Sequence, residues 1–166
     1  MYVLGIETSC DETSCAIVKN RMIISNATIS SLRFHRKYGG IIPEIATRNH
    51  VKVIDKVLSL AVSRSGIDLK KLSLIGVTYR PGLKGALMVG LNFAKALSLA
   101  LDKPFAAIDH LRSHLFAPFL DNNLRIPFPF LGLVVSGGHT ELILVKDFNK
   151  TKVLGETRDD AAGEVF

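Results

Sequence analysis

The stretch LGLVVSGGHTELILV, residues 131–145, has the pattern of two buried strands separated by a polar break. The break, SGGHT at residues 136–140, has almost no apolar surface and contains two adjacent glycines. One interpretation is a tight hairpin turn between antiparallel strands. The other is a ligand-binding loop, because glycines can adopt positive φ and bring backbone N–H groups close to anionic or carbonyl oxygens. Both interpretations predict a hairpin here.

A second stretch with the same layout, LGIETSCDETSCAIV, lies at residues 4–18. An offset of 127 residues aligns the two without a gap and matches Ser9 with Ser136 and Thr13 with Thr140. Each copy places a small polar loop between two apolar strands. Two hairpins of one kind indicate two copies of one domain, and two such loops facing each other across a cleft would form a clamp for phosphate.

The segment between the two hairpins alternates helical and strand patterns. A third strand is expected at 22–28, followed by a helix that Pro43 opens and Gly66 stops. The later expected elements are strands at 72–78 and 104–108 and helices at 85–101 and 110–120. The order βββαβαβα predicts an α/β fold in which helices cross between parallel strands after an antiparallel meander.

The second copy contains only an opening meander, with strands expected at 131–135, 141–146 and 151–154, and a helix start in DDAAGEVF. We therefore expect a complete first domain at residues 1–125 and a truncated second domain at residues 126–166. An isolated meander is marginally stable unless its apolar face is covered. A homodimer through the uncovered edge of the second domain is one expected way to cover the meander.

Composition favours a globular protein without a membrane span. The chain has 166 residues and a mean hydropathy of +0.28, and the apolar segment 85–101 carries Asn92 and Lys95. A span needs about 20 consecutive apolar residues. The N-terminus lacks the basic region of a leader, and Cys10 and Cys15 are too few for a disulfide framework. These features predict a cytoplasmic location.

The chain is basic, with a net charge of +6 and a pI near 9.5. This balance is compatible with an RNA or nucleotide partner and equally with neither. We find no basic stretch interleaved with aromatic residues of the kind that binds single strands. The cationic and imidazole side chains form two loose groups: Arg33, His35, Arg36 and Lys37, and then Arg48, His50 and Lys52.

Two carboxylates, Asp11 and Glu12, lie in the first polar loop. Such groups can contact a metal ion or accept a proton from a nucleophile. The alternative is an ordinary solvated turn. The loop is therefore a candidate catalytic segment only in combination with other groups.

Two histidines, His110 and His114, are spaced i, i+4 on an expected helix, so their imidazoles project from one face. This is the spacing of metal ligands, although a pair of surface histidines has the same pattern. The motif is not HExxH, because Leu111 follows His110 and the general-base glutamate of a zinc protease is missing. A third ligand is needed, and a carboxylate would suit zinc or ferrous iron.

The stretch RPGLKGALMVG, residues 80–90, has a glycine-rich turn that leads into a helix. Helix N-termini of this kind can bind anions. The alternative is that Gly85, Ala86 and Gly90 allow the helix to pack closely on the sheet.

Six ordered motifs resemble the family of tRNA N6-adenosine threonylcarbamoyltransferases, the TsaD family, formerly described as O-sialoglycoprotein endopeptidases. The resemblance covers essentially the whole chain. It implies an actin-like ATPase (ASKHA) fold of duplicated ribonuclease-H-like domains, of which this chain would be about the first half. The motifs are GIETSCDETSCAIV, YGGIIPEIATRNHV, PGLKGALMVG, DHLRSHLFAP, LVVSGGHTELILV and DDAAGEVF.

The resemblance implies an acyltransferase that moves threonylcarbamoyl from threonylcarbamoyl-AMP to N6 of the adenosine beside the anticodon, in tRNAs reading ANN codons. The implied partners are a paralogous non-catalytic subunit and a small ATPase of the same complex. The implied cofactor is one divalent metal, Fe2+ or Zn2+, held by His110, His114 and an aspartate beyond Phe166. The other implied site residues are Asp11 and Glu12 for catalysis and Val134, Val135, Ser136, Gly137 and Gly138 for substrate binding.

The chain departs from the family pattern at two places, with Tyr79-Arg80 before the Pro-Gly turn and Arg112-Ser113 between the histidines. Both put bulk and positive charge near the expected cleft. Two other functions stay open: a non-catalytic scaffold subunit of the same complex and a metallo-glycoprotease. With half of the cleft and one ligand missing, we expect the 166-residue chain to be inactive alone.

Overall fold

The computed structural model describes residues 1–120 and 124–165. The chain forms two compact units, Met1–His110 and Leu111–Phe166. The order of strands and long helices is the one that the hydrophobic pattern predicts. Each unit has its own sheet and its own apolar core.

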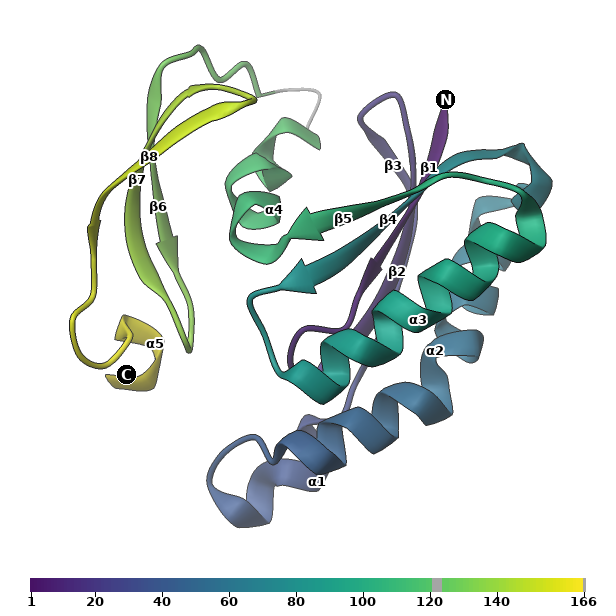
Figure 1. Ribbon diagram of the computed structural model, residues 1–166, viewed down its shortest axis with the longest axis horizontal. Coiled ribbons are helices and arrows are strands. Elements are labelled where there is room, and N and C mark those ends of the chain that lie inside the picture. The colour runs from purple at the N-terminus through teal and green to yellow at the C-terminus, as the bar shows by residue number, and fades with distance from the viewer. Residues whose placement is uncertain (121–123, 166) are drawn as a thin grey trace. The chain divides into compact units, whose positions relative to one another are not determined.

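The first unit is built on a five-stranded sheet with the order β3-β2-β1-β4-β5 (Figure 1). β1 pairs antiparallel with β2, and β2 pairs antiparallel with β3, which gives the expected opening meander. β4 runs parallel to both β1 and β5, as crossover helices require. The strands are β1 (Tyr2–Glu7), β2 (Glu12–Lys19), β3 (Met22–Ser30), β4 (Leu72–Arg80) and β5 (Phe105–Asp109).

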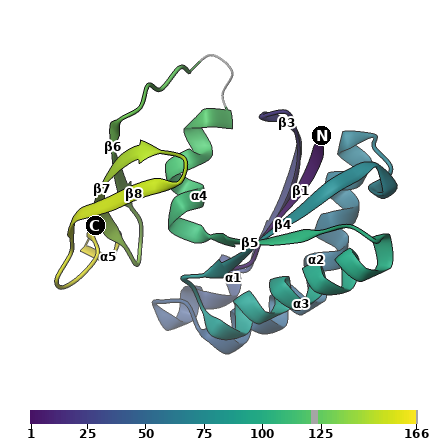
Figure 2. The ribbon, with the colours of Figure 1, turned by 45° about the horizontal axis from the view of Figure 1, so that its top comes forward.

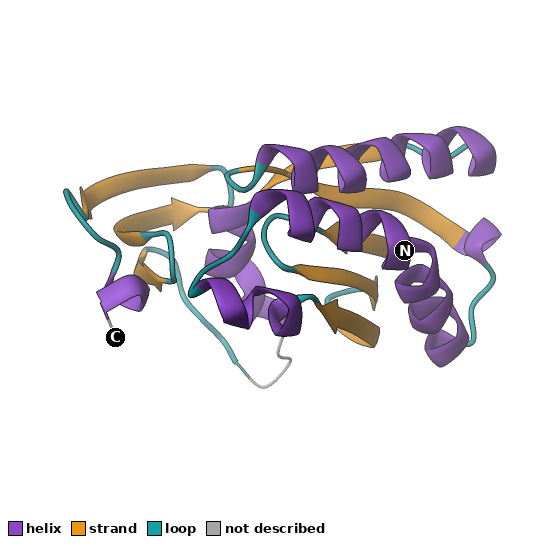
Figure 3. Cartoon of the chain, turned by 90° about the horizontal axis from the view of Figure 1, so that it is seen from below, coloured by secondary structure: helices purple, strands orange, loops and turns teal. Residues whose placement is uncertain are grey.

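Two long helices, α2 (Pro43–Ser65) and α3 (Lys84–Leu101), pack side by side on one face of this sheet (Figures 1 and 3). Pro43 occupies the first turn of α2, where its missing N–H has no cost. Gly66 ends α2 in the left-handed conformation, φ 66°, and donates its N–H to the carbonyls of the last turn. The core between helices and sheet includes Leu4, Ile17, Val57, Ile75 and Ala94.

By length and composition, α3 is the one helix in the described part of the chain that is apolar enough to cross a membrane. Core helices pass the same test. The buried residues Ala86, Leu87, Gly90 and Ala94 lie on one side of α3, and the helix packs on β4 and α2. One side of α3 therefore packs into the core of the first unit, and the rest of the helix is more exposed.

The segment between β3 and α2, for which no element was predicted, forms two short helices, α1 (Leu32–His35) and η1 (Arg36–Tyr38). A buried imidazole explains them. The Nδ1 atom of His35 accepts the backbone N–H of Ile42 at 3.0 Å, so its Nε2 carries the proton toward Ser31 Oγ at 3.1 Å. His35 is thus an internal anchor, which corrects its grouping with the surface cations. A further short helix, η2 (Leu69–Lys71), precedes β4.

The second unit contains an antiparallel three-stranded sheet in the order β6-β7-β8 (Figure 2). Its small core joins Leu115 to Val134, Ile143 and Val145. Because Leu115 packs with these strands, the chain divides into units earlier than the expected boundary at residue 125. The remaining elements are α4 (His110–Phe116), η3 (Ala117–Leu120), β6 (Phe130–Val135), β7 (Thr140–Asp147), β8 (Lys150–Glu156) and α5 (Ala162–Val165).

The two opening hairpins share one register. Leu4 pairs with Ile17 in the first hairpin, and the residues 127 positions later, Leu131 and Leu144, pair in the second. The same offset carries every pair from Val3↔Val18 to Glu7↔Ser14 onto the ladder from Phe130↔Val145 to Val134↔Glu141. Because a slip of one residue would exchange the two faces of a strand, this agreement supports duplication of one domain.

Candidate functional site

The polar loop of the first hairpin, residues 8–11, packs tightly against the start of α3. Thr8 is buried and donates its hydroxyl to the carbonyl of Ala86 at 2.8 Å. A Cβ built on Gly90 would lie 2.4 Å from Thr8 Oγ1, so only glycine fits there. Gly90 therefore allows α3 to pack closely on this loop, which is the second of the two interpretations of the 80–90 motif.

The Pro-Gly turn before α3 also closes on this loop. Gly82 has φ 151°, and a Cβ there would lie 2.6 Å from the carbonyl oxygen of Ser9. The N–H of Leu83 donates to that same oxygen at 2.8 Å. Two backbone contacts from this turn thus fix the position of Ser9.

The sequence interpretation missed one carboxylate, Glu7, which is the last residue of β1 and lies beside a histidine. Its Oε2 accepts the hydroxyl of Thr78 at 2.5 Å and lies 3.2 Å from Nδ1 of His110. Its Oε1 accepts the backbone N–H of Ser9. The sequence did contain a signal for this residue, because Glu7 is acidic in an otherwise apolar strand and a buried charge needs partners.

The electrostatics of this pair favour an ionised carboxylate. Burial acts to raise the pKa of Glu7, but hydrogen bonds from His110, Ser9 and Thr78 outweigh it and lower that pKa to about 2. The hydrogen bond to Glu7 raises the pKa of His110, against the opposing effect of burial. An imidazole that donates Nδ1–H to a carboxylate has its lone pair on Nε2, which is the usual arrangement of a metal-ligating histidine.

Another buried imidazole, His50, supports the loop from α2. Its Nε2 lies 2.9 Å from the carbonyl oxygen of Cys10, so Nε2 carries the proton, and Nδ1 accepts the hydroxyl of Thr13 at 2.7 Å. Burial lowers the pKa of His50. His50 is therefore a neutral internal residue, which corrects its assignment to a cationic surface group.

The two predicted catalytic carboxylates differ in their settings. Asp11 lies in the loop, and its Oδ2 accepts the hydroxyl of Ser30 at 3.0 Å. Its carbonyl oxygen accepts both the N–H and the hydroxyl of Ser31. Glu12 is exposed and is the first residue of β2. The loop itself therefore presents one carboxylate, and Glu12 stands at its edge.

The loop of the second hairpin is closed by its own backbone. The N–H of Ser136 donates to the carbonyl of His139 at 2.8 Å, and the N–H of His139 donates to Ser136 Oγ at 3.1 Å. Neither Gly137 nor Gly138 adopts a positive φ, contrary to expectation. A Cβ at either position would meet no other atom within 4 Å. Packing within the unit therefore gives no reason for two glycines here.

The expected helix start, α5, lies against this loop. A Cβ on Gly163 would be 2.6 Å from the carbonyl oxygen of Ser136, and the N–H of Gly163 donates to that oxygen at 3.2 Å. The N–H of Ala162 donates to Thr140 Oγ1 at 2.9 Å. The DDAAGEVF motif therefore has a structural role as the support of the hairpin loop.

A cavity of about 500 Å3 in the second unit brings several predicted residues together. Its lining includes His114 of α4 and Val134, Val135 and Ser136 of the second hairpin. The side chain of Val134 is buried in the core, whereas that of Val135 is half exposed. The predicted metal ligand and the start of the predicted substrate loop thus share one pocket.

The predicted metal ligands, His110 and His114, lie on α4, and they fall in the first and second unit respectively. Within residues 1–120 and 124–165, no group of three or more His, Cys, Asp or Glu side chains is arranged to hold a metal ion. The residues nevertheless suit a cation, because the imidazole of His110 is oriented by the carboxylate of Glu7. The third ligand beyond Phe166 stays a prediction.

Both departures from the family pattern have local partners. Arg80 Nε lies 3.5 Å from Asp109 Oδ2 at the neighbouring strand end, and its guanidinium stacks 5.0 Å from the centroid of the Tyr79 ring. Arg112 donates to the carbonyl of Phe148 at 2.6 Å within the second unit. These side chains are held by structure that the chain itself supplies.

Solved structures with this fold include YeaZ from Pseudomonas aeruginosa, with a TM-score of 0.60, 13% identity, and coverage of 95% of this chain and 68% of that one. Another is component A of (R)-2-hydroxyglutaryl-CoA dehydratase from Acidaminococcus fermentans, with a TM-score of 0.53 and 15% identity over 96% of this chain and 48% of that one. These similarities show the fold alone. They confirm the expected actin-like α/β architecture.

The sequence itself is much closer to curated relatives. It is 52% identical to the tRNA N6-adenosine threonylcarbamoyltransferases of Thermodesulfovibrio yellowstonii and Caldicellulosiruptor saccharolyticus, over 100% of this chain and 50% and 49% of theirs. The chain thus spans about half the length of these relatives. The family model for TsaD, tRNA N6-adenosine threonylcarbamoyltransferase, matches residues 22–166. With this match added to the duplicated hairpin and the motifs around it, the chain belongs to the TsaD family of tRNA-modifying transferases.

Proposed function

We propose that the protein to which this chain belongs transfers threonylcarbamoyl from threonylcarbamoyl-AMP to N6 of the adenosine beside the anticodon, in tRNAs reading ANN codons. The observation that carries the proposal is the 52% identity with transferases of this name over the whole chain. In the reaction, the adenine amine attacks the carbonyl carbon, a C–N bond forms, and the C–O bond to the phosphate breaks. AMP leaves, and the amine loses a proton.

The second hairpin loop is the proposed contact for the anhydride. Gly137 and Gly138 have no packing partner that would exclude a side chain, so the open space beside their backbone is available to a ligand. Backbone N–H groups and the hydroxyl of Ser136 suit phosphate and carbonyl oxygens. Val134 and Val135 lead into the loop from β6, and the cavity beside them includes His114.

His110 and His114 are the proposed ligands of a divalent cation, Fe2+ or Zn2+. When bound, such a cation acts as a Lewis acid that polarises carbonyl oxygens. Glu7 positions His110 through Nδ1 and keeps that ring in one orientation. The proposal includes the third carboxylate ligand beyond Phe166.

The carboxylates of the first loop are the proposed proton acceptors. Asp11 is held by Ser30 and by the backbone of residue 31, so its position is fixed before substrate arrives. Glu12 is exposed at the edge of the same loop. Either carboxylate can take the proton that the adenine amine loses. The structural link between Ser9 and Gly82 keeps this loop in place.

The proposed setting of the reaction is the cytoplasm. The proposed partners are a paralogous non-catalytic subunit and a small ATPase of the same complex. The apolar face of the second sheet favours a further contact, because Leu131, Leu133 and Val135 are more than half exposed. A homodimer through this face is the proposed state of the 166-residue chain alone.

The test uses a full-length protein of the relatives' size, threonylcarbamoyl-AMP and a tRNA transcript that reads ANN codons, with modified adenosine measured by mass spectrometry of nucleosides. We expect modification by the intact protein, none by the 166-residue chain alone, and a loss of at least about 100-fold for His110→Ala or His114→Ala. Lys70→Ala, at an exposed position in η2, is the control and keeps full activity. An intact protein that binds tRNA and the adenylate but makes no modified base would support the scaffold alternative.

A further inference from the structure

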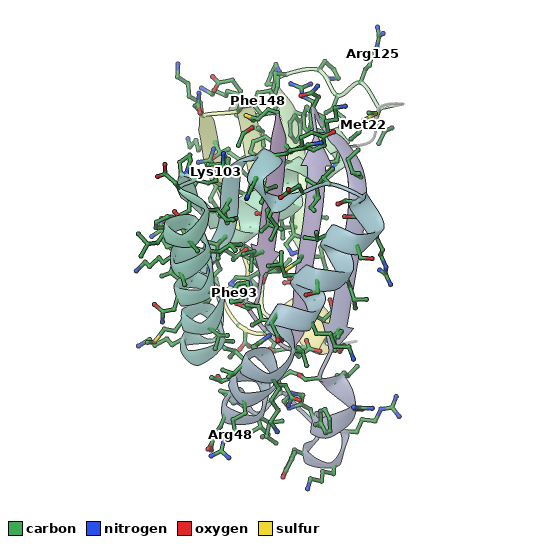
Figure 4. The ribbon with its side chains drawn as sticks, turned by 90° about the vertical axis from the view of Figure 1, so that its right-hand side faces the viewer. Met22, Arg48, Phe93, Lys103, Arg125 and Phe148 are labelled. Carbon is green, nitrogen blue, oxygen red and sulfur yellow. The ribbon has the colours of Figure 1, made fainter. Side chains whose placement is uncertain are left out.

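A basic cleft lies between the α1–η1 segment and the beginning of α2 in the first unit. It encloses about 540 Å3. Five cationic side chains line it: Arg33, Arg36, Lys37, Arg48 and Lys52. Figure 4 shows the labelled Arg48 side chain extending outward from α2. Two groups of cations that are separate in the sequence are thus brought to one surface.

The charge of this basic cleft is barely compensated. Among the described residues that line it, none is acidic. Glu44 pairs with Arg48 at 2.6 Å, and both side chains are largely exposed, so the pair is weak. Concentrated positive charge in a concave surface attracts polyanions.

Two exposed aromatic rings lie among these cations. Phe34 is 42% exposed and Tyr38 is 51% exposed, although both are large enough to favour burial. The guanidinium of Arg33 lies 4.6 Å from the Phe34 centroid, and the ammonium of Lys37 lies 4.8 Å from the Tyr38 centroid. Aromatic rings beside cations are the usual platform for unpaired nucleic-acid bases, which stack on the rings while the cations contact phosphate.

The scaffold below the cleft keeps these side chains at the surface. His35 lies between Phe34 and Arg36 in the chain and is buried, with hydrogen bonds to Ser31 and to the N–H of Ile42. Burial of this one ring orients the short helices, so that the residues on either side of it face solvent. Residues 33–38, RFHRKY, are therefore a basic stretch with interleaved aromatic residues, a pattern that the sequence interpretation did not find.

We propose that this basic cleft binds a single-stranded segment of RNA, with phosphates on its cations and bases on Phe34 and Tyr38. The proposal rests on the proposed function, since it assigns part of the surface that would hold the tRNA substrate. An acidic protein would pair with the cations equally well, but it would leave the two exposed rings without a stacking partner. Single-stranded RNA supplies phosphates for the cations and bases for the rings.

The first test measures affinity of the intact protein for a labelled single-stranded RNA of about 12 nucleotides by fluorescence anisotropy across a salt series. The cleft variant is Arg36→Ala/Lys37→Ala/Lys52→Ala, and the control variant Lys70→Ala/Lys71→Ala/Lys95→Ala removes three exposed cations elsewhere in the same unit. We expect the cleft variant to bind at least about tenfold more weakly and to lower the salt slope by about 2. The control is expected to change affinity less than threefold.

The second test separates stacking from charge. Phe34→Ala/Tyr38→Ala is expected to weaken RNA binding at least about fivefold without changing the salt slope. Heparin, a polyanion without bases, is expected to bind this variant as it binds the original protein. All substituted residues are exposed, and single variants at Lys37 and Lys52 serve if a multiple variant does not fold.

Three results would overturn the inference. The first is equal RNA affinity in the cleft and control variants, and the second is that the cleft variant loses RNA and heparin in parallel while Phe34→Ala/Tyr38→Ala has no effect. The third is that the cleft variant loses an acidic protein partner and keeps its RNA affinity. The transfer assay distinguishes this failure from failure of the proposed function. If the cleft variant modifies tRNA with an unchanged KM, the inference alone is wrong. If the cleft binds RNA but the intact protein transfers no threonylcarbamoyl, the proposed function alone is wrong.

Discussion

His50 illustrates how a single buried side chain controls the first polar loop. Its ring accepts from Thr13 and donates to the carbonyl of Cys10, which ties α2 to the loop and to β2. The ring is buried, and its two nitrogens are matched to one donor, the Thr13 hydroxyl, and one acceptor, the Cys10 carbonyl, so the neutral form is the one that fits. A change of protonation at this position is therefore linked to folding.

We expect the stability of the chain to fall as the pH drops below about 6.5, the ordinary pKa of an imidazole, in part through His50. Its folded pKa is lowered, so the unfolded state binds the proton more tightly. The contribution is present above the unfolded pKa and is lost as the pH falls toward the folded pKa. Urea unfolding between pH 8 and pH 5 measures it, and His50→Gln, which keeps a donor for Cys10, should show a weaker dependence. An unchanged profile in the variant would contradict this assignment.

Gly90 makes a second prediction at the residue scale. Gly90→Ala is expected to lower the free energy of unfolding by about 1–3 kcal/mol, because its Cβ would lie 2.4 Å from Thr8 Oγ1. In a Thr8→Ala background the same change should be neutral or stabilising, because alanine is the better helix former. Thermal unfolding of the four proteins measures this coupling, and additive effects would exclude the contact.

At the scale of elements, the second hairpin and α5 form one supporting unit. α5 has only four residues, so hydrogen bonds from Ala162 and Gly163 to the hairpin, rather than its own length, hold it in place. The two kinds of glycine in this region have different roles. Gly163 is required by packing, whereas Gly137 borders open space.

This difference gives a matched pair of substitutions. Gly163→Ala is expected to detach α5 from the loop, because the obstructing atom is the backbone oxygen of Ser136, and hydrogen exchange at residues 162–165 should increase. Gly137→Ala should change the free energy of unfolding by less than about 0.5 kcal/mol. It should nevertheless weaken binding of threonylcarbamoyl-AMP by the intact protein about tenfold if the loop contacts this ligand. If Gly137→Ala binds threonylcarbamoyl-AMP as tightly as the original protein, the loop does not contact this ligand and is a simple hairpin turn.

At the scale of the whole molecule, the duplication shows what the second sheet lacks in this chain. The offset of 127 residues places Leu131 and Leu133 at the positions of Leu4 and Ile6. Leu4 and Ile6 are at most 3% exposed beneath α2 and α3, whereas Leu131 and Leu133 are 62% and 65% exposed. An apolar sheet face of this kind favours association.

We therefore expect the 166-residue chain to self-associate through this face. Leu131→Lys/Leu133→Lys should shift it toward the monomer in sedimentation velocity, because two charges would be buried in the contact. Met88→Lys/Leu99→Lys, at exposed apolar positions of α3, is the control and should leave the association unchanged. Identical sedimentation of the two variants would place the contact elsewhere.

Local patterns in the sequence were enough to predict the strands and long helices. Pro43 and Gly66 mark the ends of α2 because their backbone preferences act within one or two residues. The repeat at residues 4–18 and 131–145 predicted two hairpins, and the shared register agrees with it. The candidate loops and the histidine pair were found the same way, because each is a contiguous motif.

Contacts between distant residues could be decided only by the tertiary structure. Glu7 and His110 are 103 positions apart, and the sequence gives no sign that one orients the other. Burial also reversed the assignment of His35 and His50, because an imidazole is a surface cation or an internal hydrogen-bonding group according to what packs over it. The basic cleft exists only because α1 and η1 fold beside α2 and add their cations and rings to Arg48 and Lys52. Charge and stacking act through space, so their sum depends on the fold.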